Sequence, residues 1–397
     1  MILLSDDNEA EEIAEGKISD KLLVKMISTA EKYGLRGDLY GNYIACKLIL
    51  NENEYAKACE KRTGGKECSI DAFARKDAEV LLKIFGKDEE QYTPAFENTG
   101  SEDFRAGKKI MKLCEQLRNC CRQDEILKVL SGFYSENGIG IFALYRGFII
   151  GEDGALTPVS RYSDATFEKI YGYERQKKQL KTNTEAFLDG QPANNVLLYG
   201  DSGTGKSTAV KALLSEYEKK GLRIVGVQKH QFVKLSGIIS QLSKRKQKFI
   251  ILLDDLSFEN FETEYKYLKA IIEGGVAEKP DNILIYATSN RRHLVTETFA
   301  EREGGGDIHR EETTSEKVSL SERFGLQIYY AKPDKQEYMD IVMFLAEKHF
   351  PEMDKNTLIA GANAFAVKHG GFSGRAATQY IMSLCAENNK KIELPLE

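Results

Sequence analysis

The stretch from Tyr199 to Thr208, YGDSGTGKST, crowds glycines and hydroxyl side chains around a single lysine, directly after the apolar run Val196–Leu198. It fits the pattern G-x-x-x-x-G-K-[ST], which binds nucleotide phosphates. Glycines let backbone N–H groups face a phosphate, and the start of the next helix adds its positive dipole end. The predicted phosphate-binding residues are Gly200, Asp201, Ser202, Gly203, Thr204, Gly205, Lys206, Ser207 and Thr208.

Within this loop, Lys206 is expected to reach the β- and γ-phosphates of a nucleotide, and the Ser207 hydroxyl to bind Mg²⁺. The alternative is a glycine-rich turn between strand and helix that holds no ligand.

A pair of carboxylates follows another apolar run, in FIILLDD at 249–255. A carboxylate at the end of a neighbouring strand can hold the Mg²⁺ shell of a bound nucleotide, which is the role predicted for Asp254. Asp255 would stand beside it, placed to orient or deprotonate water. An aspartate pair can also simply open a turn, and this alternative stays open.

These residues need a scaffold that gathers strand ends. Apolar, β-prone runs at 195–199, 223–227, 249–253 and 282–287 alternate with helical patterns at 207–219, 232–242 and 261–273. Strands that are apolar throughout are buried on both faces, and their alternation with helices predicts a parallel sheet with right-handed crossovers. Helical patterns at 333–349, 356–369 and 373–387 close the chain and predict a small lid.

The first 150 residues are mostly helical in pattern, with apolar side chains at helical spacing in 20–34, 69–86 and 107–121. We therefore expect an N-terminal, mainly α-helical domain at 1–155, an α/β nucleotide-binding core at 156–331 and a C-terminal helical lid at 332–397. The segment 301–317 combines three consecutive glycines with many charges, which predicts a mobile loop inserted in the core.

Composition limits the classes of function. The net charge of −5 over 397 residues argues against a protein that coats duplex DNA or adheres to membranes. The N-terminus lacks the basic start and long apolar run of a secretory signal, and the apolar stretch 139–151 is too short to span a membrane and carries Arg146. The seven cysteines include no Cys-x-x-Cys pair and are expected to be free thiols rather than metal ligands. A cytoplasmic protein without a membrane partner is the simplest expectation.

Five motifs, in their order along the chain, resemble those of AAA+ ATPases: GDSGTGKST, FIILLDD, ATSN (287–290), SERFG (321–325) and GFSGR (371–375). The run YGYERQKKQLKTNTEAFLDGQPANNVLLYG, together with SLSERFGL, resembles a bacterial AAA+ group known as domain-of-unknown-function family 815. The resemblance covers about residues 125–390. It implies a P-loop NTPase αβα core, ATP and Mg²⁺ as cofactors, and a homo-oligomer, for which a hexamer is a family expectation.

The resemblance also implies roles for single residues. Asn290 resembles the polar sensor near the attacking water, Arg323 the arginine finger that acts on a neighbouring subunit, and Arg375 the sensor arginine carried by the lid. Tyr171 and Gly172 stand where the family packs the adenine. The alternatives are a helix cap for Asn290, a surface ion pair for Arg323 and an ordinary helix start for Arg375.

Two departures from the family pattern matter. Asp255 stands where a glutamate is usual, and its shorter side chain predicts slow turnover, with Glu259 as a possible substitute. Protein-threading members carry an aromatic–apolar–glycine loop, whereas the corresponding stretch 228–237 has Lys234 after Phe232 and Val233. This weakens the unfoldase interpretation.

The sequence thus predicts an AAA+ ATPase that couples Mg²⁺-dependent ATP hydrolysis to a conformational change or to remodelling of an unidentified protein or nucleic-acid partner. A nucleotide-gated binding module with little hydrolysis is the first alternative, and a P-loop small-molecule kinase is the second. The basic run 243–248 is interpreted as a solvated helix end, with a nucleic-acid contact as its alternative.

Overall fold

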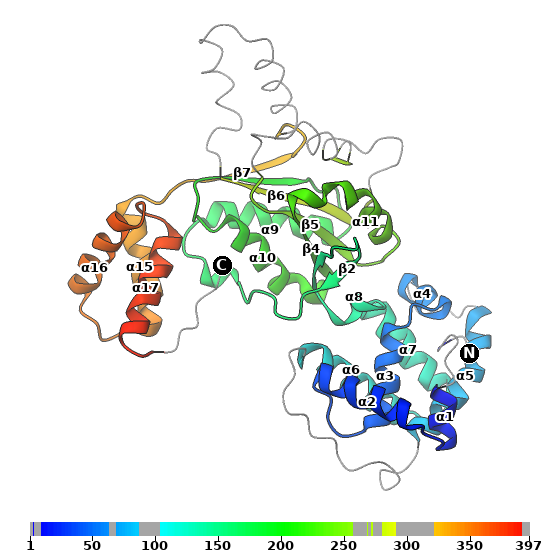
Figure 1. The fold of residues 1–397 in the computed structure, drawn as a ribbon. Helices are drawn as coiled ribbons and strands as arrows, with labels where there is room; N and C mark the ends of the chain where they lie inside the picture. Colours follow the sequence, from blue (N-terminus) through cyan, green and yellow to red (C-terminus); the bar gives the residue numbers. More distant parts are fainter. Residues whose placement is uncertain are drawn as a thin grey trace. The chain divides into compact units, whose positions relative to one another are not determined.

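A computed structural model describes residues 9–62, 69–86, 104–256, 280–290 and 321–390, together with 3, 268, 271 and 272. The chain forms two compact units (Figure 1). The first contains residues 1–148, 157–162 and 244–247, and the second contains 149–156, 163–243 and 248–397. The helix expected at 261–273 falls largely outside the described residues, as does the whole of the insert expected at 301–317.

The first unit is helical. Its helices are α1 (Glu9–Glu15), α2 (Asp20–Tyr33), α3 (Leu39–Leu50), α4 (Glu54–Lys61), α5 (Ser69–Phe85), α6 (Phe104–Arg118), α7 (Gln123–Asn137) and α8 (Ile141–Leu144). Ser19, Asp38 and Asn53 cap α2, α3 and α4 by accepting backbone N–H bonds with their side chains. The helices expected at 20–34, 69–86 and 107–121 are confirmed as α2, α5 and α6.

The basic segment 244–247 belongs to this helical unit. The side chain of Arg245 is only 8% exposed and pairs with Glu52. Lys246 Nζ donates to Ser135 O at 3.1 Å. The interpretation of this run as a solvated helix end is therefore wrong for Arg245, whose side chain is buried against Glu52, whereas Lys244 and Lys246 are exposed just after the end of α11.

The second unit is built on the strands β3 (Val196–Gly200), β4 (Leu222–Val227), β5 (Lys248–Leu253), β6 (Ile283–Ser289) and β7 (Leu326–Tyr330). The short strands β1 (Gly147–Ile150) and β2 (Leu156–Pro158) come first in the same sheet order, and residues 147–148 and 157–158 of these strands are assigned to the first unit. The order is β2-β1-β4-β5-β6-β3-β7, and the pairs β4–β5, β5–β6, β6–β3 and β3–β7 are parallel. The four strands expected from apolar runs are confirmed as β3 to β6, and every residue of β6 is buried.

The strands β1, β2 and β7 were not expected. In β7 only Ile328 and Tyr330 are buried, while Tyr329 is exposed. The sequence LQIYY therefore shows no continuous apolar run, because β7 is an edge strand with one partner, β3.

The register aligns three strand ends. Leu253 of β5 lies opposite Ala287 of β6, and Tyr199 of β3 lies opposite Ser289. The residues that follow β3, β5 and β6 thus meet at the carboxyl edge of the sheet, where open α/β sheets bind ligands.

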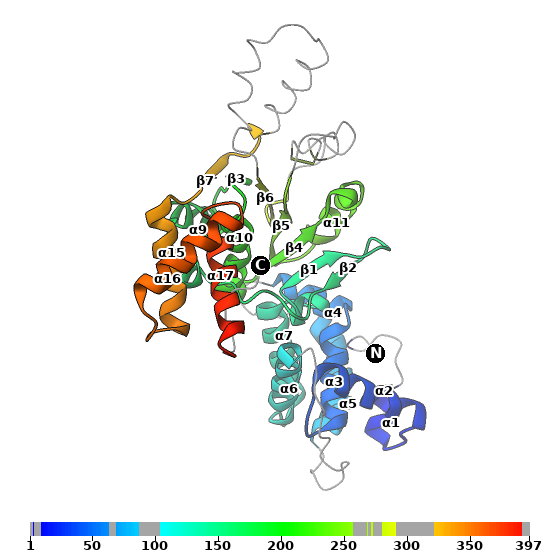
Figure 2. The same ribbon diagram turned by 60° about the vertical axis from the view of Figure 1, so that its left-hand side comes forward.

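Helices α9 (Glu174–Leu188) and α10 (Lys206–Tyr217) pack on the sheet, α9 against β7 and α10 against β4 and β6. The helix expected at 232–242 begins as a 3₁₀ turn, η4 (Lys229–Lys234), before α11 (Leu235–Leu242). The last three helices, α15 (Lys335–His349), α16 (Lys355–Lys368) and α17 (Gly374–Glu387), lie side by side around a shared apolar core (Figure 2). We call these three helices the lid.

Candidate active site

The loop between β3 and α10 has the backbone shape expected of a phosphate cradle. Gly200, Gly203 and Gly205 have φ values of 131°, 72° and 86°, which side chains other than glycine rarely adopt. A Cβ atom on Gly200 would lie 2.1 Å from the carbonyl oxygen of Tyr330. The loop can therefore curl closely against β7 only with glycine at this position.

Lys206 is the first residue of α10, and only 4% of its surface is exposed to solvent. Its Nζ donates to Gly200 O at 3.1 Å and to Asp201 O at 2.6 Å. Burial lowers the pKa of this amine to about 8, although Asp201, Asp255 and Asp254 act in the opposite direction. The amine is thus held inside the loop with its charge poorly solvated, which favours an anionic ligand.

Ser207 and Asp254 come together as predicted for a metal site. Ser207 Oγ donates to Asp254 Oδ1 at 2.5 Å, and Thr288 Oγ1 donates to the same oxygen at 2.6 Å. A hydroxyl that gives its proton to a carboxylate presents its lone pairs to a cation. Hydroxyl, carboxylate and phosphate oxygens are the ligands that Mg²⁺ prefers, so these residues fit the ion.

Asp255 has a left-handed backbone, with φ of 54°. Its N–H donates to Thr288 Oγ1 at 2.9 Å, and its Oδ1 accepts from Asn290 Nδ2 at 2.7 Å. Asn290 thus lies at the carboxylate pair, as its predicted sensor role requires. Glu259, the candidate substitute for Asp255, lies outside the described residues.

The lid meets the phosphate loop through the start of α17. The N–H of Arg375 donates to Gly203 O at 3.1 Å, and its Nη1 lies 3.3 Å from Ser202 Oγ. Ser373 caps the same helix. Arg375 therefore both lies in the first turn of a helix, in line with its alternative interpretation, and extends its guanidinium to the loop.

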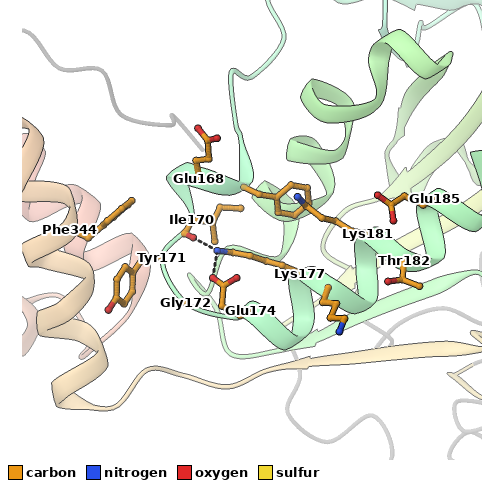
Figure 3. Close-up of a pocket in the computed structure, with 12 residues that line it drawn as sticks. Glu168, Ile170, Tyr171, Gly172, Glu174, Lys177, Lys181, Thr182, Glu185 and Phe344 are labelled. Carbon is orange, nitrogen blue, oxygen red and sulfur yellow. Dashed lines mark hydrogen bonds and ion pairs between the residues drawn. The ribbon is translucent and has the colours of Figure 1, made fainter.

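Tyr171 and Gly172 line a pocket of about 870 Å³ together with residues of η2 (Phe167–Lys169), α9 and α15. The ring of Tyr171 lies 5.4 Å from that of Phe344 on α15, and Lys177 Nζ donates to Ile170 O at 2.5 Å (Figure 3). Ile170 also borders the phosphate loop, since a Cβ on Gly205 would lie 3.9 Å from Ile170 Cγ2. The pocket is therefore adjacent to the cradle.

Arg323 is half-buried on the turn that precedes β7, where Phe324 N donates to Ser321 O at 3.2 Å. Its predicted role concerns a neighbouring subunit and stays a prediction.

Two residues of this region were not singled out from the sequence. Thr288 lies within the quoted ATSN motif, and the alignment of β5 with β6 is the signal that could have identified it. Phe344 is one apolar residue among many on an amphipathic helix, and no sequence signal marks it.

The cysteines of the described residues, which exclude Cys68, are free thiols. None of the helices in the described ranges has the length and apolar character needed to cross a membrane.

Residues 144–388 match a family model described as "Protein of unknown function (DUF815)". The chain is 24% identical to the proteasome-activating nucleotidase of Methanococcus maripaludis over 250 residues, 55% of this chain and 57% of the relative. It is 30% identical to that of Methanothermobacter thermautotrophicus over 162 residues, 34% of this chain and 40% of the relative. The ATP-dependent zinc metalloprotease FtsH of Aquifex aeolicus is 22% identical over 222 residues, 50% of this chain and 32% of the relative.

The chain spans about half the length of curated relatives that it matches, 56% of one and 57% of another. Among solved structures, the RuvB Holliday junction branch migration motor of Thermotoga maritima is 16% identical, with a TM-score of 0.39 over 57% of this chain and 67% of that chain.

Proposed function

This chain belongs to the DUF815 family of AAA+ ATPases, and from that premise we propose that it binds ATP with Mg²⁺ and hydrolyses it slowly. The cycle of binding and hydrolysis is coupled to a conformational change that acts on a protein or nucleic-acid partner. We further propose that it works in the cytoplasm as a homo-oligomer, in which Arg323 reaches the nucleotide of a neighbouring subunit.

The observation that carries the proposal is one line of hydrogen bonds. It runs from Ser207 through Asp254 and Thr288 to Asp255 and Asn290, beside the buried amine of Lys206. A glycine-rich turn without a ligand would have no need to bury a lysine amine beside three carboxylates. A polyphosphate with a divalent cation would supply an opposite charge to the amine and to the carboxylates.

In the proposed reaction, the bond from the terminal phosphorus to the bridging oxygen breaks, a bond to a water oxygen forms, and ADP leaves. Backbone N–H groups at the start of α10 and the amine of Lys206 bind the phosphates. Ser207 and Asp254 would hold Mg²⁺, which neutralises the charge that develops on the phosphate oxygens. Asp255 accepts the proton of the attacking water, and Asn290 orients Asp255.

The lid contributes charge from the other side. Arg375 lies at Ser202 in the loop, where its guanidinium can bind a phosphate oxygen of the nucleotide. Turnover is expected to be slow, because the aspartate at position 255 reaches the water less directly than the usual glutamate.

The test is calorimetric titration with a slowly hydrolysed ATP analogue in Mg²⁺, using wild type, Lys206→Ala and Lys211→Ala. Lys211 lies on the same helix α10, so its variant controls for the loss of a lysine there. Lys206→Ala should lose most of the affinity, and Lys211→Ala should keep it. No heat from wild type, or equal affinity in the two variants, would contradict the proposal.

A nucleotide-gated binding module is the second candidate. It is favoured by the short side chain of Asp255, whose Oδ1 already accepts a hydrogen bond from Asn290. If Asp255→Asn leaves turnover at the wild-type level while partner capture still depends on ATP, this second function replaces the first.

A further inference from the structure

The end of β6 binds the turn that follows β5 residue by residue. Thr288 Oγ1 contacts both Asp254 and Asp255, Ser289 Oγ donates to Leu256 O at 2.7 Å, and Asn290 contacts Asp255. The backbone takes part as well, since Leu256 N donates to Thr288 O at 2.7 Å. This cross-strand network fixes the position of the carboxylate pair relative to the sheet.

Thr288 is central to the network and is only 2% exposed. Its hydroxyl acts as both donor and acceptor: it donates its hydrogen to Asp254 Oδ1 at 2.6 Å and accepts from the N–H of Asp255 at 2.9 Å. We infer that Thr288 is a positioning residue that sets the geometry of both carboxylates for Mg²⁺-dependent hydrolysis. The inference rests on the proposed function of this site.

At Asp254, the bond from Thr288 acts on the orientation of the carboxylate. Oδ1 accepts from the Ser207 and Thr288 hydroxyls, which come from different elements, α10 and β6. Two donors on one oxygen fix the rotation of the carboxylate plane. An outer partner of this kind holds a metal ligand in its binding orientation without touching the metal.

At Asp255, the hydrogen bond to Thr288 restrains the backbone conformation. A left-handed conformation is uncommon for a residue with a side chain, although aspartate tolerates it better than most. The bond from the Asp255 N–H to Thr288 Oγ1 satisfies a polar group that this turn takes out of the strand ladder. It thereby holds the direction in which the Asp255 side chain leaves the turn.

Threonine suits this role better than other hydroxyl residues. Its branched Cβ restricts χ1, so the hydroxyl stays between the two aspartates at little entropic cost. Valine has nearly the same shape and no hydroxyl, whereas serine keeps the hydroxyl and loses the restriction. These two substitutions separate the hydrogen bonds from the packing.

The experiment measures two quantities in wild type, Thr288→Val and Thr288→Ser. The first is the Mg²⁺ concentration that gives half the maximal ATPase rate, with kcat and KM for ATP determined separately. The second is the rise in Tm caused by ADP with Mg²⁺, compared with the rise caused by ADP with EDTA. The second readout needs no turnover and reports on Mg²⁺ at the site.

For Thr288→Val we expect the half-saturating Mg²⁺ concentration to rise or kcat to fall by about 10- to 100-fold, the effect typical of outer partners of metal ligands. KM for ATP should change little, and the Mg²⁺-specific part of the Tm rise should disappear. Thr288→Ser should stay close to wild type. If Thr288→Val does not fold, Thr288→Ala removes the same hydroxyl with a smaller side chain.

Thr184→Val is the matched control. Thr184 is fully buried in the same unit, and its Oγ1 lies 2.8 Å from Leu180 O and 2.8 Å from the hydroxyl of Tyr286. The same chemical change should therefore lower stability there and leave the Mg²⁺ dependence unchanged. If Thr288→Val behaves like Thr184→Val while wild type responds to Mg²⁺, the inference alone fails. If wild type shows no Mg²⁺-dependent nucleotide response, the proposed function fails, and the inference with it.

Discussion

The side-chain amide of Asn290 donates a 2.7 Å hydrogen bond to Asp255 Oδ1, so the residue after β6 and the second residue after β5 meet at the carboxyl edge of the sheet. This contact joins two motifs whose residues lie 35 positions apart in the chain. It places the amide on the carboxylate proposed to accept a proton from water. It also gives the first prediction.

Asp255→Asn should abolish most hydrolysis and preserve nucleotide binding. Asparagine tolerates the left-handed backbone as well as aspartate does, but its amide cannot accept the water's proton. General-base contributions suggest a fall in kcat of about 10²- to 10⁴-fold. Single-turnover hydrolysis and analogue titration measure the two effects. Unchanged kcat would remove Asp255 from the catalytic step.

The lowered pKa of Lys206 predicts how nucleotide affinity varies with pH. In the free protein, burial lowers this pKa to about 8, and a bound phosphate should raise it again. Nucleotide affinity is then highest below about pH 8 and falls as the pH rises through the pKa of the free protein. The fall in affinity approaches tenfold per pH unit until the pKa of the nucleotide-bound protein is reached. Nucleotide titrations between about pH 7 and about pH 9.5 measure how steeply the affinity changes with pH.

Lys206→Arg provides the control, because a guanidinium stays charged across this range. Whatever its affinity at neutral pH, the variant should show a flatter profile. A wild-type profile that is equally flat would contradict the assignment of the titrating group.

Gly200→Ala should destabilise the second unit strongly. The added Cβ would lie 2.1 Å from Tyr330 O, at a φ of 131°. Backbone strain of this kind costs about 2–4 kcal/mol in the free energy of unfolding. Gly221→Ala is the matched control, since Gly221 also has a positive φ, 86°, but nothing lies within 4 Å of its added Cβ. Denaturant titration should show the larger loss for Gly200, and equal losses would contradict the close packing.

Tyr171→Ala and Phe344→Ala should weaken ATP binding if the pocket beside the cradle takes the adenine. Both rings are more than a third exposed and lie 5.4 Å apart, so an aromatic base can stack on them. We expect a loss of about 1 kcal/mol for each, which is several-fold in affinity. Phe73→Ala, which removes an exposed aromatic ring of the helical unit, should have no effect. Equal affinities in all three variants would place the adenine elsewhere.

Arg323→Ala should lower the ATPase rate without lowering nucleotide affinity, because its proposed target is the phosphate of a neighbouring subunit. Arginine fingers contribute about 10³-fold or more to kcat. The wild-type rate per subunit should rise with protein concentration as subunits assemble. A rate independent of both concentration and Arg323 would exclude the assembled form of the proposal.

Much of the fold follows from local sequence signals. The strands β3 to β6 were predicted because each contains a run of apolar, β-prone residues, the pattern of a strand buried on both faces. The edge strand β7 was missed because Gln327 interrupts its apolar pattern. Within the basic run at 243–248, Arg245 was misread because nothing local indicates that Glu52 would lie beside it.

The sequence by itself determined the phosphate loop, since the glycines, lysine and serine of this motif are adjacent in the chain and their backbone requirements are local. It also placed Asp254, Asp255 and Asn290 at strand ends. Only the tertiary structure decided that Thr288 lies between the two aspartates and that Phe344 faces Tyr171. Strand register and helix docking depend on the packing of segments far apart in the chain. The sequence around a hydroxyl or an aromatic ring therefore does not show which residue will contact it in the folded protein.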